Sequence, residues 1–230
     1  MSEIFTERTE LLLGAKGIQR LSESRVAVFG IGGVGGYVAE ALARAGVGKL
    51  DLIDPDIIRE SNLNRQIWAL RSTVGKPKAD VAKERLLDIN PDLEIYVHKL
   101  FFLPENADSI SFKDFDYVVD AIDTVSGKMA IILEAKKAGV PMISSMGTGN
   151  KLDPSRLTLG DLFETEVCPL ARVMRQLCRK NGVTRLKVLY SKEPPRKCSD
   201  REEGTVGSVP FVPPVAGLMI ASEVIKDLLK

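Results

Sequence analysis

A chain of 230 residues, 44% hydrophobic and 27% charged, has the composition of an ordinary globular protein that can bury a sizeable core. Its 32 lysines and arginines balance 31 aspartates and glutamates, so no overall charge draws it to nucleic acid or membranes. Any such contact must come from local clusters of charge. At this length we expect a single domain over residues 1–230.

The number and spacing of the cysteines indicate the redox state of the cellular compartment. Cys168, Cys178 and Cys198 are an odd number without a CxxC pair, which favours a reducing compartment and disfavours a disulfide framework or a structural zinc site. The first residues, MSEIFTERTELLLG, lack the basic start and apolar run of a signal peptide. We therefore expect a cytoplasmic protein without structural zinc.

The first half of the chain alternates short apolar runs with helical patterns. The run at 25–29 ends in glycines, and the helical pattern after it stops at Gly46. Strands joined by helices in this way predict an α/β fold: a Rossmann-like, doubly wound, mostly parallel sheet with ligands beyond the carboxyl ends of its strands. The expected strands are 25–29, 49–54, 94–100, 115–123 and 140–145, and the expected helices are 34–45, 77–89 and one ending near Lys137.

The second half is less regular. Residues 156–162 and 185–191 are expected to form strands on either side of a basic helix over 170–180. The most apolar stretch, 209–229, is interrupted by prolines and a glutamate, whereas a membrane-spanning helix needs roughly 20 consecutive apolar residues. We expect a buried terminal helix that begins after Pro214, and leave weak membrane association open.

The sequence GIGGVGG, at 30–36, follows the first expected strand. Glycines let the backbone turn sharply and approach a phosphate, whose charge the N–H groups at the helix start stabilise. The candidates for this contact are Gly30, Gly32 and Gly33. Asp54 ends the second strand, where a carboxylate can accept both ribose hydroxyls. These features fit a nicotinamide or flavin site as well as a site for another nucleotide.

The segment after Asp54 distinguishes these ligands. The two phosphates of a dinucleotide are neutralised largely by the helix start, whereas cleavage of a triphosphate needs cations at its additional oxygens. Because this segment carries arginine and lysine among its polar residues, it favours a nucleoside triphosphate. Its candidate site residues are Asp56, Ser61, Asn62, Asn64, Arg65, Gln66, Lys76 and Lys78.

Two carboxylates, Asp120 and Asp123, end the strand expected over 115–123. A carboxylate at this edge of the sheet can hold the Mg²⁺ that bridges phosphate oxygens. The alternative, that the two acids cap the helix that follows, stays open. We take Asp123 as the metal candidate and place Thr124 in the same nucleotide site.

The motifs GIGGVGG, LIDPD, SNLNRQ, VGKPKAD and VVDAIDT, in this order, resemble the ThiF-type adenylating domain of the ubiquitin-activating-enzyme superfamily. The resemblance runs from about Arg8 to the final helix. Within the superfamily the chain is most similar to the tRNA threonylcarbamoyladenosine dehydratase branch, through FTERTELLLG, DINP, VLYSKEPP and the terminal helix.

The resemblance implies an enzyme that uses ATP and Mg²⁺ to adenylate the carboxylate of threonylcarbamoyladenosine in tRNA, which then cyclises with loss of water. Arg8 matches an arginine that reaches the γ-phosphate in the partner subunit, which implies a homodimer. The alternative, from the residues alone, is an ordinary exposed charge in an N-terminal segment. Arg8, Arg65, Lys78 and Asp123 are the residues expected to act in catalysis. The other implied contacts are Gly33 with the phosphates, Asp54 with the ribose, and Asn64 with the triphosphate.

One departure from the superfamily bears on the substrate. Relatives that activate proteins usually carry paired CxxC motifs for zinc, and this chain has none. Adenylation of a ubiquitin-like sulfur-carrier protein is therefore the second candidate function, and a non-enzymatic nucleotide-binding scaffold is the third. Sulfur-transfer accessory proteins remain possible partners.

Three further features remain to be interpreted. Cys168, before a proline at an expected helix start, is the best placed cysteine for a covalent thioester, although ordinary thiols are expected. His98, the only histidine, is expected on a solvated strand. Arg172, Arg175 and Arg179 share a helix face that either tracks tRNA phosphates or is simply solvated.

Overall fold

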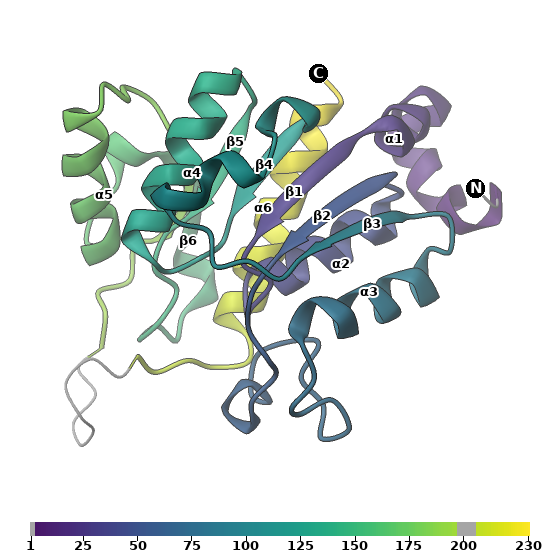
Figure 1. Ribbon diagram of the computed structural model, residues 1–230, viewed down its shortest axis with the longest axis horizontal. Coiled ribbons are helices and arrows are strands. Elements are labelled where there is room, and N and C mark those ends of the chain that lie inside the picture. The colour runs from purple at the N-terminus through teal and green to yellow at the C-terminus, as the bar shows by residue number, and fades with distance from the viewer. Residues whose placement is uncertain (1–2, 197–205) are drawn as a thin grey trace.

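The computed structural model describes residues 3–196 and 206–230. Its centre is a seven-stranded sheet of order β3-β2-β1-β4-β5-β7-β6 (Figure 1), in which β6 runs antiparallel to β7 and the other neighbours are parallel. The expected Rossmann-like, doubly wound sheet is confirmed. The strands are β1 Arg25–Phe29, β2 Lys49–Ile53, β3 Glu94–His98, β4 Tyr117–Asp120, β5 Met142–Ser145, β6 Leu157–Asp161 and β7 Lys187–Ser191.

Helices cover both faces of the sheet (Figure 1). One face carries α1 Glu3–Glu23, α2 Gly35–Ala45, α3 Lys78–Ile89 and α6 Val212–Leu228, and the other carries α4 Val125–Ala138 and α5 Pro169–Lys180. The short 3-10 helices are η1 Glu60–Asn62, η2 Pro104–Ser109, η3 Phe112–Asp114, η4 Pro154–Arg156 and η5 Leu162–Glu164.

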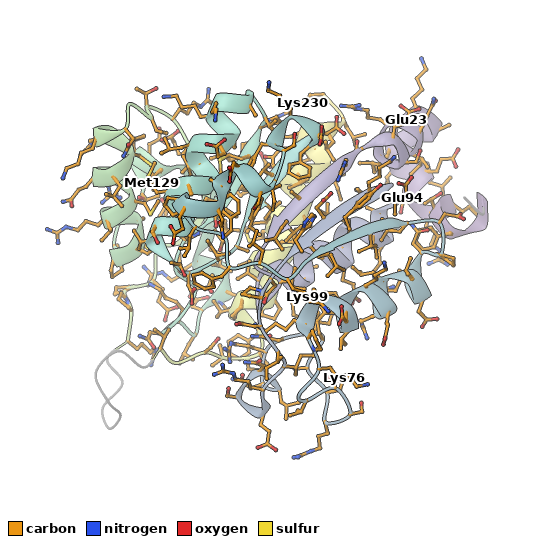
Figure 2. The ribbon with its side chains drawn as sticks, viewed as in Figure 1. Glu23, Lys76, Glu94, Lys99, Met129 and Lys230 are labelled. Atoms are coloured by element: carbon orange, nitrogen blue, oxygen red, sulfur yellow. The ribbon has the colours of Figure 1, made fainter. Side chains whose placement is uncertain are left out.

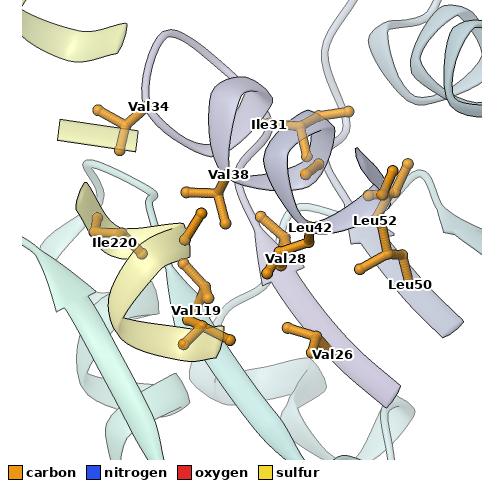
Figure 3. Packing of buried hydrophobic residues seen from close by; sticks show 14 of the residues in the cluster. Val26, Val28, Ile31, Val34, Val38, Leu42, Leu50, Leu52, Val119 and Ile220 are labelled. Carbon is orange, nitrogen blue, oxygen red and sulfur yellow. The ribbon is translucent and has the colours of Figure 1, made fainter. Parts of the chain in front are cut away.

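Strand β1 shows why these residues form a central strand. Val26 and Val28 point to the core under α2 and α6, whereas Ala27 and Phe29 point to the core under α4. Figure 3 shows the first of these cores, with the two valines below α2. Because successive strand residues face opposite sides, a strand buried on both faces needs a continuous apolar run. This explains why the short run at 25–29 was recognisable in the sequence.

Two helices differ from expectation. Helix α6 begins at Val212 rather than after Pro214, because the first turn of a helix has free N–H groups and therefore accepts proline. Helix α1 was not anticipated at all. Its Leu11 and Leu12 are 82% and 87% exposed, although Leu21 near its end is fully buried, so the apolar residues of its first half do not mark a buried face. Its backbone is kinked at Gly14 with φ 72°.

Helix α6 is the buried terminal helix expected from the sequence. Ala216, Ile220 and Val224 have no exposed surface. A Cβ atom at Gly217 would lie 2.4 Å from the carbonyl oxygen of Val34, so only glycine permits this approach to α2. Among the described residues, no helix is both long and apolar enough to cross a membrane.

A charged cluster joins β4, β7 and α6. Asp227 accepts hydrogen bonds from the Tyr117 hydroxyl at 2.8 Å, Lys187 at 2.5 Å and Lys230 at 2.7 Å. Burial alone would raise the pKa of the Asp227 carboxyl, but these three donors outweigh it and hold the pKa at about 2, below its ordinary 3.8.

This lowered pKa predicts an acid-sensitive contribution to stability. Since the carboxyl has a lower pKa in the folded than in the unfolded chain, its contribution is complete above pH 3.8 and is lost as the pH falls through about 2. We expect Asp227→Asn to lower the free energy of unfolding by about 2 kcal/mol at pH 7 and to have little effect near pH 2. Urea unfolding at several pH values measures this, with the exposed Asp108→Asn as control. A cost that does not change with pH would contradict it.

Candidate functional site

The glycine turn between β1 and α2 is the first part of the site. Gly30 has φ 78°, and its N–H donates to the Ile53 carbonyl at 2.7 Å. A Cβ atom at Gly35 would lie 1.8 Å from the Gly30 carbonyl oxygen, so the turn excludes a side chain there. The first turn of α2 therefore lies at the carboxyl edge of the sheet, where its N–H groups and dipole favour an anion.

Asp54 lies directly after β2 and is buried beside this turn. One carboxylate oxygen accepts the N–H of Ile31 at 2.9 Å, and the other accepts the N–H of Asp56 at 2.9 Å. Burial raises the pKa of Asp54 above its ordinary value, against the opposing effects of Lys78 and the two N–H donors. Each oxygen keeps a further lone pair, so the carboxylate is able to accept hydroxyl donors.

Lys78 begins α3 and is only 5% exposed. Its Nζ atom lies 2.7 Å from the Asp56 carboxylate and 3.7 Å from the Asp54 carboxylate. Long cationic side chains are rarely buried unless paired, and here two acids supply the pairing. The arrangement holds an ammonium group at the edge of the sheet, where phosphate oxygens can replace Asp56 as its partner.

The segment between β2 and α3 projects from the sheet as an irregular excursion, residues 54–77, and Figure 2 shows Lys76 within it. Its ends are tied together, because Ile58 N–H donates to the Lys76 carbonyl at 2.9 Å. Its middle is anchored by Trp68, whose buried indole N–H donates to the Ile31 carbonyl at 2.9 Å. Trp68 was not anticipated from the sequence, although it is the only tryptophan of the chain, which was the available signal.

Arg65 and Asn64 lie in this excursion against the glycine turn. The Arg65 guanidinium donates to the Ser61 carbonyl and to the Asn64 side-chain oxygen, each at 2.9 Å. A Cβ atom at Gly33 would lie 3.4 Å from Arg65 Cγ, so the arginine stem runs along the turn. Asn64 also donates to the Ser208 carbonyl at 3.0 Å, which brings the segment before α6 to the site.

The two amides of the excursion have different surroundings. The Asn62 side-chain oxygen accepts the Arg59 N–H at 3.0 Å and so stabilises the turn of η1. Gln66 is buried next to Gly32, and its Oε1 atom has no hydrogen-bond partner among the described residues. A buried amide oxygen requires a donor, which water or the hydroxyl and amino groups of a nucleotide supply. The residues present therefore fit a nucleotide.

The two carboxylates at and after the end of β4 are in different environments. Asp120 is fully buried, 2.9 Å from Lys128 Nζ and 2.5 Å from the Ser144 hydroxyl. It does not cap α4, whose N-cap residue is Thr124, so the capping interpretation of Asp120 was wrong; a cation eight positions along the chain neutralises its carboxylate inside the core. Asp123 is exposed, and Thr124 is the N-cap residue of α4 without a side-chain capping hydrogen bond.

The Asp123 loop lies against the glycine turn. A Cβ atom at Gly30 would lie 2.9 Å from the Ala121 carbonyl oxygen and from the Ile122 side chain. The structure thus brings the carboxyl ends of β1, β2 and β4 together with the excursion. Within the described residues, no three His, Cys, Asp or Glu side chains gather as a metal-binding group. A metal ion at Asp123 would therefore take its other ligands from phosphates and water.

Other candidates lie apart from this site. Arg8 is exposed on α1, and no contact joins it to the site in the described part of the chain. Cys168 is buried as the N-cap residue of α5, and burial raises the pKa of the Cys178 thiol to about 11, while Cys198 lies outside the described residues. His98 is not simply solvated, because its Nε2 lies 2.8 Å from the buried Asp51 carboxylate.

A doubly wound sheet with a glycine turn after its first strand and a buried acid after its second defines a Rossmann-like nucleotide-binding protein. The chain belongs to the ThiF family, whose family model matches residues 7–230. The family resemblance expected from the motifs is confirmed.

Within this family, the chain is similar to proteins that share one name. The chain is 42% identical to the tRNA threonylcarbamoyladenosine dehydratase of Bacillus subtilis, over 97% of this chain and 94% of that protein. It is 40% identical to the Escherichia coli protein of the same name, over 73% of this chain and 63% of that protein. The E. coli crystal structure in complex with ATP has a TM-score of 0.91 at 33% identity, covering 99% of this chain and 94% of that one. The AMP complex gives the same values.

Proposed function

We propose that this chain is an ATP-dependent tRNA threonylcarbamoyladenosine dehydratase. The observation that carries the proposal is the likeness, over 99% of the chain, to the E. coli enzyme crystallised with ATP. The 42% identity with the B. subtilis protein extends over 97% of this chain and 94% of that protein. This similarity over nearly the full length supports the same substrate for both proteins. The whole chain, residues 1–230, then acts as one adenylating domain.

The reaction consists of two displacements. A carboxylate oxygen of the threonylcarbamoyl group attacks the α-phosphorus of ATP, the α–β phosphoanhydride bond breaks, and pyrophosphate leaves. A nitrogen or oxygen of the same substrate then attacks the activated acyl carbon, the substrate gives up a proton to solvent, and AMP leaves with the former carboxylate oxygen. The net change in the nucleoside is therefore the loss of one water.

The charged residues supply the help that this chemistry needs. Asp54 holds the ribose, while Lys78 and Arg65 neutralise the oxygens that gain charge as the α–β bond breaks. Asn64, Gln66 and the glycine turn orient the nucleotide, with Asp56, Ser61, Asn62 and Thr124 around them. The supporting geometry is the burial of Lys78 between two carboxylates next to that turn.

We assign Mg²⁺ to Asp123. The ion usually keeps several waters and binds through one or two carboxylates plus phosphates, which fits a single exposed acid at this edge of the sheet. When bound, Mg²⁺ supplies positive charge to the phosphate oxygens. Asp123 would hold the ion through its carboxylate.

We further propose that the active unit is a cytoplasmic homodimer in which Arg8 reaches the γ-phosphate bound by the partner subunit. Two features of Arg8 support this: it is exposed on α1, and it has no place in the site of its own chain. Sulfur-transfer accessory proteins are compatible with this assignment.

The proposed function predicts a definite product. Incubation with ATP, Mg²⁺ and tRNA that carries threonylcarbamoyladenosine is expected to release AMP and to convert the nucleoside to a form lighter by one water. Mass spectrometry of the digested nucleosides measures this. Transcribed tRNA without the modification is the control and should release no AMP. If AMP forms only with a ubiquitin-like sulfur-carrier protein, the second candidate function replaces this one.

A further inference from the structure

The outer side of α5 and the loop after it form a basic surface that the nucleotide site does not use. We call Arg172, Arg175, Arg179, Lys180 and Arg185 the basic α5 surface. Helix α5 contains no acid, and the only carboxylates over 162–186 belong to Glu164 and Glu166 in the turn that precedes the helix. Since the whole chain has a net charge of only +1, this is a local concentration of positive charge.

Two arginines near other helices of this protein, Arg44 on α2 and Arg85 on α3, are paired with the same acid. Arg44 lies 2.9 Å and Arg85 2.7 Å from the Glu40 carboxylate. Across the described parts of the chain, no ion pair engages Arg172, Arg179 or Lys180, and Figure 2 shows nitrogen-tipped side chains projecting outward from α5. Arg185 is 91% exposed and reaches Asp161 only at 4.0 Å. An acid three or four positions from a cation stabilises a helix, and α5 offers its cations no such partner.

Two of these arginines are held in place. The Arg175 guanidinium donates to the Thr165 carbonyl at 2.7 Å and also to the Thr165 hydroxyl. The Arg179 guanidinium lies 5.5 Å from the centre of the Phe163 ring. Ordered side chains lose less conformational entropy when they bind a partner, so the surface is prepared for contact.

The amino end of α5 lies at the same edge of the sheet as the nucleotide site. A Cβ atom at Gly147, after β5, would lie 3.7 Å from Cys168 Sγ at the start of α5. Strand β5 neighbours β4, whose carboxyl end leads to Asp123. A cavity of about 660 Å³ opens here, with Val167, Arg172 and Arg175 in its lining. A long anion that is bound along α5 would therefore extend toward the nucleotide site.

We propose that the basic α5 surface binds the phosphate backbone of the tRNA substrate and guides the modified nucleoside to the nucleotide site. The proposal rests on the proposed function. Charge complementarity selects a polyanion, and the packing of α5 selects RNA over a membrane. A helix that binds a membrane inserts its apolar face into the lipid, whereas the apolar residues Ala171 and Met174 of α5 are fully buried in the protein core.

The test compares two charge-matched double variants. Arg172→Gln with Arg179→Gln removes cations from the basic α5 surface, and Lys83→Gln with Lys113→Gln removes two exposed cations elsewhere. We expect the first variant to bind tRNA at least about tenfold more weakly, with a salt dependence reduced by about 1.5 in log–log slope. ATP affinity measured by calorimetry should match the wild type in both variants. The tRNA affinity of the single variant Arg172→Glu is a second measurement. This variant reverses one charge and leaves the contact between Arg179 and the Phe163 ring unchanged.

Each outcome decides the proposal. Equal tRNA affinity and salt slope in the two double variants would overturn the docking surface while leaving the proposed function intact. Loss of binding to vesicles of phosphatidylglycerol, with tRNA binding retained, would reassign the surface to a membrane. A wild-type protein that binds ATP but no tRNA would overturn the proposed function itself.

Discussion

Lys78→Met is expected to reduce ATP-dependent turnover by about 10²–10³-fold, and Arg65→Ala to have a similar effect. Each change removes a positive charge from the edge of the sheet where a triphosphate is proposed to bind. Lys78 matters because its ammonium group is buried beside the glycine turn and is already held 2.7 Å from Asp56. A single-turnover assay of AMP release from ATP and modified tRNA measures the effect on chemistry.

The matched control is Lys83→Met, which removes an exposed cation from the same helix. It should retain wild-type turnover. Because Lys78 also neutralises Asp54, its removal has a structural cost, and urea unfolding of each variant separates this cost from the loss of chemistry. If folded Lys78→Met and Arg65→Ala proteins both turn over at the wild-type rate, the assignment of the site is wrong.

The second large effect concerns stability. Lys128→Met is expected to lower the free energy of unfolding by about 3–5 kcal/mol, because it leaves the buried Asp120 carboxylate without its cation. Both side chains are 0% exposed, and Lys128 Nζ also donates to the Ser145 carbonyl at 2.7 Å. The interaction joins the ends of β4 and β5 to α4, just below the loop that carries Asp123.

A control variant and a double variant test this prediction. Lys137→Met, an exposed position on the same helix, should change the free energy of unfolding by no more than about 0.5 kcal/mol. The double variant Lys128→Met with Asp120→Asn removes the unpaired charge and should recover a large part of the loss. A loss in Lys128→Met no greater than in Lys137→Met would show that the pair contributes nothing to the fold.

Much of the fold was predictable from local patterns. The run at 25–29, the glycines after it and the stop at Gly46 each follow from a preference that acts within a few residues of the chain. Asp54 was predictable for the same reason, since an acid after an apolar strand must lie at the carboxyl edge of a parallel sheet. Whether Asp54 contacts the ribose stays a prediction, as does the contact of Arg65 with the triphosphate, which the Arg65→Ala variant tests.

What the patterns could not predict depends on contacts between distant residues. Asp120 ends β4 and Asp123 follows it, but only the fold places Lys128 and Ser144 against the first and leaves the second exposed. The anchoring of Trp68 to the glycine turn likewise joins segments far apart in sequence.

Two kinds of information thus describe this protein. Residue order specified the alternation of strands and helices, the glycine turn and the acid at Asp54, because backbone preferences and burial periods act over short distances. The partners of Lys78, the burial of Asp120 and the exposure of the basic α5 surface were set by tertiary packing. The reason is physical: whether a charge is paired, buried or free depends on which distant atoms surround it, and spacing along the chain carries no record of them.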